Sequence, residues 1–246
     1  DAFSASHRAH ASTTGLAKYL PSCAGKLMEA ELKALESVLG QPERPVATVV
    51  GGAKISTKIA LLENLIEKVD CIIIGGAMAN TFLFSKGFNV GRSLVEESLK
   101  PTALKIINKA KKYSCKVILP TDVIIAKELS QNIPTSVVSA NECPENYMIL
   151  DVGPSTVDNI KQCINSAKTL LWNGPLGAFE VSPFDEATSQ IDMGSESEIY
   201  KIIENLKNTT TVIFVAHRLS ALKKIDKIYI VEDGSVTSSG NHEELI

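Results

Sequence analysis

The chain has 246 residues, of which 44% are hydrophobic and 22% charged, a composition typical of a globular protein. Its formal net charge of -3 gives no general attraction to nucleic acid or to an anionic membrane surface, so neither is an expected partner. No apolar run approaches the ~20 residues of a membrane span and no signal peptide is visible, so we expect a cytoplasmic protein without direct membrane insertion.

The five cysteines are scattered singly, without a CxxC pair and without a spacing suited to zinc. We therefore expect reduced packing thiols and no bound structural metal. We also expect a monomer.

The first part of the chain predicts one helix. Residues 22–39 carry apolar side chains at helical spacing, and Gly40 and Pro42 end the pattern. The chain begins at Asp1 within a stretch of sequence typical of a folded protein, and it stops inside an apparent helix over residues 241–246. Both ends therefore look cut, and we expect a truncated protein.

Short apolar strands then alternate with amphipathic helices. Strands are predicted over residues 46–50, 70–74, 116–119, 123–126, 148–150 and 169–172, and helices over residues 55–68, 78–85, 99–113 and 155–167. This alternation predicts an α/β, Rossmann-like fold, in which a parallel sheet has helices on both faces. Right-handed crossovers put every strand-to-helix turn on one edge of the sheet, where ligands bind in such folds.

The turn after the first strand carries two glycines and two lysines. Gly51 and Gly52 would let backbone N–H groups approach a phosphate at a helix N-terminus. Lys54 and Lys58 are four residues apart, so we expect them on one face of the first helical turn or just before it, where their charges would counter nucleotide phosphates. A plain glycine turn with two solvated lysines is the alternative.

Two further turns have a related design. Gly75 and Gly76 begin a run of small residues that leaves room for a flat ligand such as a base, or lets a helix and a strand pack closely. Asn173 follows the last predicted strand in a constrained Asn-Gly-Pro turn, where its side chain would bind a phosphate or its Mg²⁺. Glu180 would bind ribose hydroxyls. Each turn alone is also compatible with a tight turn without function.

Four motifs, in this order and at these intervals, resemble the C-terminal half of phosphoglycerate kinase: GGAKISTKI, GGAMANTFL, LDVGPST and WNGPLGAFE. DAFSASHRAHAST and LMEAELKALESVL resemble the stretch that precedes and includes the interdomain helix of that family. The resemblance covers about residues 1–184. It implies transfer of a phosphoryl group from 1,3-bisphosphoglycerate to ADP with Mg²⁺.

The resemblance also implies roles for single residues. Lys54 and Lys58 would act in catalysis by contacting the nucleotide and the transferring phosphate, and Arg8 would touch phosphoglycerate. The nucleotide site would be lined by Gly51, Gly52, Gly75, Gly76, Asn173, Gly174, Pro175 and Glu180.

Two departures from the family pattern lower the expected activity. In this family, most of the basic residues that bind phosphoglycerate lie in a part of the protein that precedes the position matched by Asp1. A Gly-Gly-Gly-Asp phosphate loop is expected after Glu180, and no such run occurs in the sequence. We therefore expect ADP or ATP to bind weakly, 3-phosphoglycerate or 1,3-bisphosphoglycerate to bind weakly or not at all, and turnover to be low or absent.

The end of the chain resembles a different family. FDEATS at residues 184–189 and AHRLS at residues 216–220 are similar to the last quarter of an ABC-transporter ATPase domain. That resemblance makes Asp185 the Mg²⁺-linked acid, Glu186 the base and His217 the γ-phosphate sensor. The phosphate loop of that family is missing, so we interpret the two acids as a carboxylate pair at a helix start.

The tail nevertheless keeps the order of helix and strand that the kinase fold needs. We expect a helix over residues 195–206, and a strand over residues 211–215 that enters the sheet in the slot of the missing kinase segment. Residues 228–238 predict a β-hairpin added at the edge of the sheet.

The predicted organisation thus has three parts. Residues 1–44 are a remnant of an N-terminal domain with the interdomain helix, residues 45–184 the nucleotide-binding domain, and residues 185–246 the ATPase-like tail. Three functions remain open at this point: a nucleotide-binding kinase domain, an ATPase partner of a transporter, and a fused or truncated product without independent activity.

Overall fold

The computed structural model describes residues 15–26, 28–29, 42–130, 133–177, 203, 205–206, 209–215, 226, 228–232 and 235–241. Contacts divide the chain into two compact units, Glu43–Val215 and Asp1–Pro42 with Ala216–Ile246, and each is described by itself. Most of the helix predicted over residues 22–39 lies outside the described residues, as do Arg8, Glu180, Asp185, Glu186 and His217.

The larger unit is built on a five-stranded parallel sheet with the strand order β3-β2-β1-β7-β8. Its strands are β1 (Val46–Val50), β2 (Cys71–Ile74), β3 (Lys116–Ile118), β7 (Thr169–Asn173) and β8 (Thr211–Val215). The central strand β1 pairs with β2 on one side and with β7 on the other, so the carboxyl ends of these three strands are neighbours.

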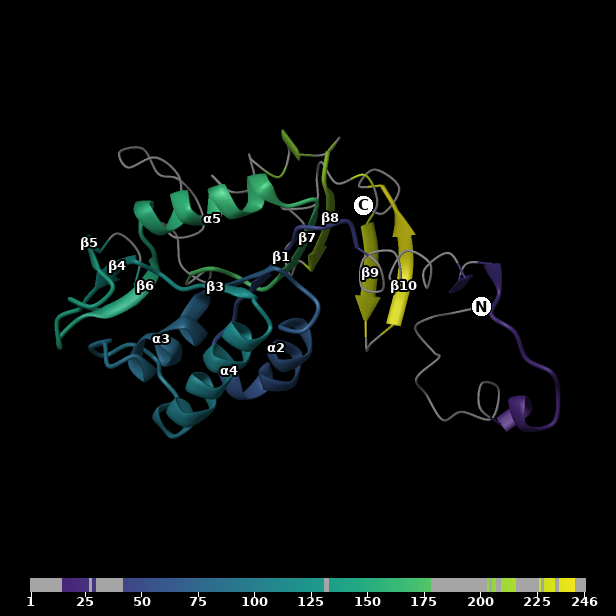
Figure 1. Cartoon of the computed structure of the whole chain (residues 1–246), viewed down its shortest axis with the longest axis horizontal. Coiled ribbons are helices and arrows are strands. Elements are labelled where there is room, and N and C mark those ends of the chain that lie inside the picture. The colour runs from purple at the N-terminus through teal and green to yellow at the C-terminus, as the bar shows by residue number, and fades with distance from the viewer. Residues whose placement is uncertain are drawn as a thin grey trace. The chain divides into compact units, whose positions relative to one another are not determined.

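Helices cover both faces of this sheet, as predicted. Figure 1 shows α2 (Ile59–Leu65), α3 (Gly76–Ser85) and α4 (Lys100–Lys112) on one face, and α5 (Pro154–Ser166) on the other. None of the described helices combines the length and the apolar character that a membrane span requires.

The alternation of side chains along the strands builds one apolar core on each face. Val46 and Val50 of β1 pack with the α2–α4 side, whereas Ala47 and Val49 pack with the α5 side. The β2 residues divide in the same way, because successive side chains of a strand point to opposite faces. Residue Ile203, in the region of the helix predicted over residues 195–206, joins the α5-side core.

Three of the strands form a second sheet, which differs from the prediction of one parallel sheet. β4 (Asp122–Ala126), β5 (Ser136–Ser139) and β6 (Met148–Val152) pair antiparallel in the order β5-β4-β6. The physical reason is the connections, since β4, β5 and β6 follow one another without a helix, and a parallel pairing needs a long crossover. The prediction also missed β5, whose residues are mostly exposed.

The helix predicted over residues 55–68 is divided in two. A 3₁₀ turn, η4 (Ile55–Thr57), precedes α2, and Lys58 between them has φ -124° and ψ 5°, outside the helical region. A second 3₁₀ turn, η5 (Glu97–Leu99), precedes α4, and a third, η3 (Leu16–Lys18), lies in the smaller unit.

The predicted docking of residues 211–215 is confirmed, because β8 pairs in parallel with β7 along its whole length. The predicted hairpin is also present, as β9 (Ile228–Glu232) and β10 (Ser235–Gly240). The described strands β9 and β10 pair with each other in a two-stranded sheet, and the expected place of the hairpin at the edge of the parallel sheet stays a prediction.

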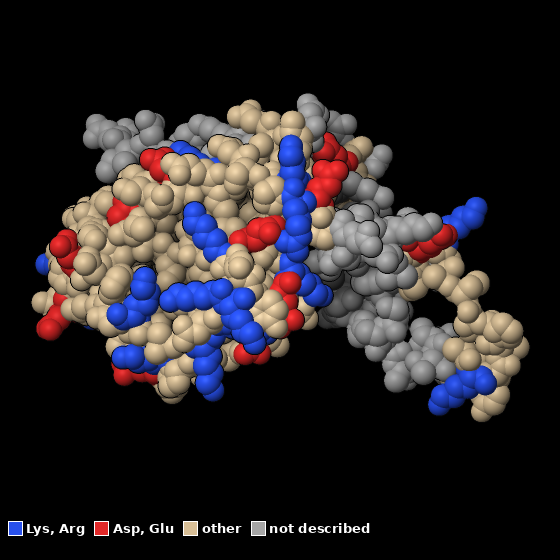
Figure 2. Space-filling view, viewed as in Figure 1, with Lys and Arg blue, Asp and Glu red and all other residues tan. Residues whose placement is uncertain are grey.

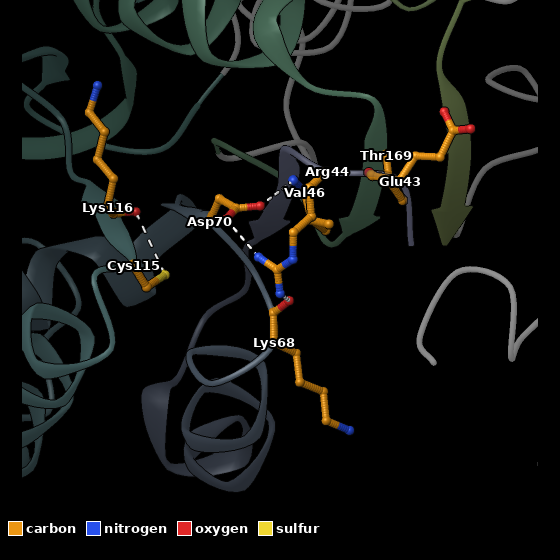
Figure 3. A network of polar contacts seen from close by, with 8 residues as sticks. All are labelled: Glu43, Arg44, Val46, Lys68, Asp70, Cys115, Lys116 and Thr169. Atoms are coloured by element: carbon orange, nitrogen blue, oxygen red, sulfur yellow. Dashed lines mark hydrogen bonds and ion pairs between the residues drawn. The ribbon is translucent and has the colours of Figure 1, made fainter. Parts of the chain in front are cut away.

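A polar network closes the amino edge of the parallel sheet (Figure 3). The Asp70 carboxylate accepts from the Arg44 guanidinium at 2.6 Å and from the Val46 N–H at 2.7 Å, and Arg44 also donates to the Lys68 carbonyl at 2.9 Å. These bonds join the start of β1 to the start of β2 and help to fix their register. Arg44 and Asp70 are substantially exposed, so their ion pair itself contributes little to stability.

Candidate functional site

The three glycine-containing turns predicted from the sequence meet at the carboxyl edge of β2, β1 and β7. Gly51 N–H donates to the Asn173 carbonyl at 2.8 Å, which joins the turn after β1 to the end of β7. Gly76 N–H donates to the Leu176 carbonyl at 2.7 Å, which joins the turn after β2 to the turn after β7. Residues far apart in the sequence therefore form one continuous surface.

The glycines are needed because the turns pack backbone against backbone. A Cβ atom on Gly51 would lie 1.8 Å from the Pro175 carbonyl oxygen, and one on Gly174 would lie 2.4 Å from the Gly51 carbonyl oxygen. Gly76, with φ +65°, would place a Cβ atom 2.8 Å from both N and O of Gly52. No other residue fits these three positions without moving the backbone.

This packing changes the role expected of the glycine N–H groups. The N–H groups of Gly51 and Gly76 donate to Asn173 and Leu176, and that of Gly75 donates to the Val50 carbonyl at 3.1 Å. These three donors are engaged inside the protein. The Gly51 N–H is therefore not directed to a phosphate, and at Gly75 and Gly76 the contacts favour close packing, which was one of the two alternatives for that turn.

Lys58 crosses from the first turn to the third. Its ammonium group donates to the Asn173 side-chain oxygen at 2.6 Å, over a separation of 115 residues. The Gly52 backbone lies beneath its side chain, since a Cβ atom there would be 3.8 Å from Lys58 Cε. Partial burial lowers the pKa of Lys58, because burial penalises the charged form. Two of the predicted site residues are thus brought into direct contact.

Lys54 and Lys58 both precede α2, which is the second of the two places that the sequence predicts for them. The Lys54 backbone is extended, with φ -133° and ψ 130°, and its side chain is exposed. Lys54 and Lys58 flank η4 and do not share a helical face, because the 3₁₀ turn replaces the first turn of the predicted helix. Lys54 adds positive charge at the edge of the site, whereas Lys58 lies within it.

Glu96 holds the lysine turn, and the sequence analysis missed it. Its carboxylate accepts from the Ser56 N–H at 3.0 Å and from the Ser56 hydroxyl at 2.6 Å. Its own N–H donates to the Thr81 hydroxyl oxygen at 3.1 Å, which ties it to α3. Burial raises the pKa of Glu96, but the bonds from Ser56, together with the Ile55 backbone and the charge of Lys54, outweigh it and leave the pKa below its ordinary value. No local pattern signals this pair, since 40 residues separate its members.

The Asn-Gly-Pro turn is fixed by the only tryptophan of the chain. The indole N–H of Trp172 donates to the Gly174 carbonyl at 3.0 Å, and the side chain is 1% exposed. Pro175 and Gly174 lie against Gly51, so the turn after β7 forms one wall of the site. The fluorescence of Trp172 is therefore a natural reporter of this turn.

Positive charge alone does not locate the site. Figure 2 shows Lys and Arg side chains gathered over the region of α2 and α4, and α4 alone contains five lysines. Lys109 of α4 is also bonded, to the Glu63 carbonyl at 2.8 Å and to the Glu67 carboxylate at 2.6 Å. What distinguishes Lys58 is that its bond joins two of the glycine turns and that partial burial lowers its pKa. Within the described part of the chain, no group of three His, Cys, Asp or Glu side chains is arranged to hold a metal ion.

Comparisons with known proteins agree with the order of these turns. A sequence model of the phosphoglycerate kinase family matches residues 1–234. The phosphoglycerate kinase of Jannaschia sp. (strain CCS1) is 60% identical over 188 residues, which are 76% of this chain and 48% of that protein. That of Ruegeria pomeroyi is 56% identical over 189 residues, which are 77% of this chain and 48% of that protein. The chain spans about half the length of these relatives.

Solved structures extend the similarity to the fold. Phosphoglycerate kinase from Coxiella burnetii superimposes with a TM-score of 0.81 at 40% identity, over 91% of this chain and 56% of that one. The enzyme from Pyrococcus horikoshii superimposes with a TM-score of 0.65 at 24% identity, over 92% of this chain and 55% of that one, a likeness of fold alone.

The family match passes residue 184, where the sequence motifs place the end of the kinase resemblance, and none of these comparisons shows an ABC-transporter ATPase segment. Since the match covers well over half of the residues and the parallel sheet carries the family's glycine turns at one edge, this chain belongs to the phosphoglycerate kinase family.

Proposed function

We propose that the unit Glu43–Val215 binds ADP or ATP with Mg²⁺ at the carboxyl edge of its sheet, as a nucleotide-binding domain for phosphoryl transfer between 1,3-bisphosphoglycerate and ADP. The observation that carries this proposal is the bond from Lys58 to Asn173, which joins the first and third glycine turns. It holds a partly buried cation at the edge of the sheet where nucleotides bind in this fold class.

Lys58 would exchange Asn173 for a phosphate oxygen when a nucleotide arrives. The ammonium group would then stabilise the charge that develops on the transferring phosphoryl group, which is the main task of protein groups in this chemistry. Lys54, which is exposed, would add long-range attraction. Mg²⁺ would come with the nucleotide, held chiefly by phosphate oxygens and by few protein ligands, among which the Asn173 oxygen is a candidate.

The second glycine turn would provide the surface for the base. Gly75 and Gly76 carry no side chain, and Leu176 fits closely against Gly75, where a Cβ atom would lie 2.4 Å from Leu176 Cδ2. This contact is the close packing that the sequence left open as the alternative, so the second turn as a surface for the base stays a prediction. The roles of Glu180 as a ribose ligand and of Arg8 as a phosphoglycerate ligand remain predictions. The monomeric state, the cytoplasmic location and the three-part division of the chain are also predictions from the sequence.

We further propose that the 246-residue polypeptide, assayed by itself, transfers phosphoryl groups slowly or not at all. Its sequence contains no Gly-Gly-Gly-Asp run, and it spans about half the length of its curated relatives. We therefore expect this polypeptide to bind nucleotide but to show little or no turnover.

Titration with Mg-ADP, followed through Trp172 fluorescence and by calorimetry, tests the binding site. We expect saturable binding that is lost when Lys54 and Lys58 are both replaced by alanine. The double replacement of Lys105 and Lys111 on α4 removes the same charge away from the turns and is the matched control. Equal affinity of the wild type and the Lys54/Lys58 variant would remove the assignment.

A coupled assay with 1,3-bisphosphoglycerate and ADP tests turnover separately. Little or no product is expected from the wild-type polypeptide, and robust turnover would overturn the proposal of low activity without affecting the binding site.

The ATPase interpretation of residues 184–246 leads to a different outcome. ATP hydrolysis that Glu186→Gln abolishes and Lys54→Ala leaves unchanged would support it. The pairing of β8 with β7 supports a kinase-like use of this segment, because β8 completes the parallel sheet beside the proposed site.

A further inference from the structure

Two thiols from distant parts of the chain meet between β2 and α5. Cys71 is the first residue of β2, Cys163 lies near the end of α5, and their Sγ atoms are 2.8 Å apart over a separation of 92 residues. Both are free thiols. Since a disulfide bond is about 2.0 Å long, the two sulfur atoms are about 0.8 Å from bonding distance.

The pair lies at the border of the core. Cys71 is 7% exposed and belongs to the apolar cluster beneath α5, and Cys163 packs against that cluster but remains partly exposed. A small oxidant can therefore reach Cys163 from solvent, whereas the surrounding apolar side chains keep larger thiols away from Cys71.

The electrostatic environment makes the two sulfur atoms unequal. A hydrogen bond with Cys71 lowers the pKa of Cys163, against the effect of burial, and the charge of Lys116 lowers it further. The same hydrogen bond, with burial, raises the pKa of Cys71. Lys116 is the residue of β3 that pairs with Cys71, and Figure 3 shows its side chain extended from that strand. Cys163 is thus the thiol that more readily becomes a thiolate, the form that reacts with oxidants.

We propose that Cys71 and Cys163 are a redox-active pair, a modification site at which a peroxide forms a reversible disulfide between β2 and α5. The proposal rests on the geometry of the two sulfur atoms and is independent of the proposed nucleotide site.

The reaction takes two steps. The Cys163 thiolate attacks one oxygen of the peroxide, the O–O bond breaks, hydroxide leaves and is protonated to water, and Cys163 becomes a sulfenic acid. The Cys71 sulfur then attacks the Cys163 sulfur, the S–O bond breaks, and the leaving hydroxide takes the Cys71 proton as a second water. The two thiols lose two electrons in total, and the peroxide gains them.

The bond would act on stability and not on the site at the opposite edge. Cys71 begins β2, whereas Gly75 follows the other end of the strand, so the cross-link lies toward the amino edge of the sheet. It would join two elements that pack through one core, and closing so long a loop restricts the unfolded chain.

Trypsin gives a direct test, because each of the five cysteines falls in a different tryptic peptide. After treatment of the folded chain with hydrogen peroxide, Cys71 and Cys163 should both be lost from the five free thiols, whether or not the exposed Cys23 also reacts. Mass spectrometry without reduction should find residues 69–86 joined to residues 162–168 with the loss of two hydrogens. Dithiothreitol should restore all five thiols.

Three variants assign the roles. Cys115→Ser is the matched control, because Cys115 is buried in the core on the other face of the sheet, and the link should still form. Cys71→Ser should stop the reaction at a sulfenic acid on Cys163, which dimedone traps. Cys163→Ser should leave Cys71 unmodified.

The thermal midpoint of the oxidised wild type should rise by roughly 5–10 °C over the reduced form, as expected for closure of a long loop. The proposal is overturned if peroxide leaves the two peptides unlinked in the folded wild type while the exposed Cys23 reacts. Dimedone labelling of Cys71 instead of Cys163 in the single variants would overturn the assigned order. Peptide mapping of the wild type decides the matter even if a serine variant fails to fold.

Discussion

Lys58 donates to the Asn173 side-chain oxygen at 2.6 Å, although 115 residues separate them. The bond exists because β1 and β7 are neighbours in the parallel sheet and their following turns share one edge. It gives the lysine a fixed position before any ligand arrives, so less side-chain freedom is lost when a phosphate binds.

Replacing Asn173 should distinguish the effect of holding Lys58 in place from the effect of the Lys58 charge on nucleotide binding. In Asn173→Asp the new carboxylate would pair with Lys58 and repel phosphate, so affinity for Mg-ADP should fall by about tenfold or more, or about 1.4 kcal/mol. Asn173→Ala should weaken binding less, because the Lys58 charge stays available. Calorimetric titration of both variants measures the difference. An aspartate variant that binds as tightly as the wild type would show that Lys58 does not contact the nucleotide.

Gly51→Ala should destabilise the fold. Its Cβ atom would lie 1.8 Å from the Pro175 carbonyl oxygen, so one of the two turns must move. A loss of roughly 2–4 kcal/mol in the free energy of unfolding is expected, as for strain in packed backbone.

Gly87→Ala is the matched control, since Gly87 has φ +89° but nothing lies within 4 Å of its Cβ position. That variant should lose only the conformational cost of about 1–2 kcal/mol. Chemical denaturation measures the free energy of unfolding of the two variants. Equal losses of this free energy would show that the contact between the two turns does not contribute to stability.

Asp122→Asn should remove an acid-dependent part of the stability. The Asp122 carboxylate accepts from the N–H groups of Ser155 and Thr156 and from the Thr156 hydroxyl, at the first turn of α5. Burial raises the pKa of Asp122, but these hydrogen bonds outweigh it and set the pKa below the ordinary value of 3.8. A lowered folded-state pKa means that the contribution is present above 3.8 and is lost as the pH falls through the folded-state value.

At pH 7 the Asp122→Asn variant should therefore be less stable by about 1–2 kcal/mol, as for the loss of a helix cap. The difference in stability between the wild type and this variant should disappear in acid. Asp158→Asn, on the exposed side of the same helix, should change stability little at either pH. Denaturation curves at pH 7 and in acid measure both variants, and an unchanged difference in acid would contradict the prediction.

Glu96→Gln should loosen the lysine turn while leaving the fold intact. The amide oxygen can still accept from the Ser56 N–H, and the amide NH2 can donate to the Ser56 hydroxyl oxygen. Both bonds then lose the charge of the carboxylate, which should weaken them by about 1 kcal/mol in total. If this weakening makes the position of Lys58 less fixed, the affinity for Mg-ADP should fall by roughly threefold to tenfold. Glu97→Gln, its neighbour in the sequence, is the control. A drop in thermal midpoint without a change in affinity would make Glu96 a purely structural residue.

Local patterns in the sequence determined most of the elements. The alternation of apolar residues in β1 and β2 sends side chains to two faces, and that period predicts a sheet covered on both sides. The predicted turns at Gly51, Gly75 and Asn173 also lie where expected, because each closes a buried strand. The family motifs are also short stretches of contiguous sequence, and for that reason they could be identified without a structure.

The tertiary structure alone decided which distant groups meet. Nothing local in the sequence encodes that Lys58 meets Asn173, that Glu96 caps the turn at Ser56, or that Cys163 reaches Cys71. These contacts depend on strand order and on the packing of whole helices. A residue's neighbours along the chain set its conformation and burial, but its partners across space are set only when all the elements have taken their places.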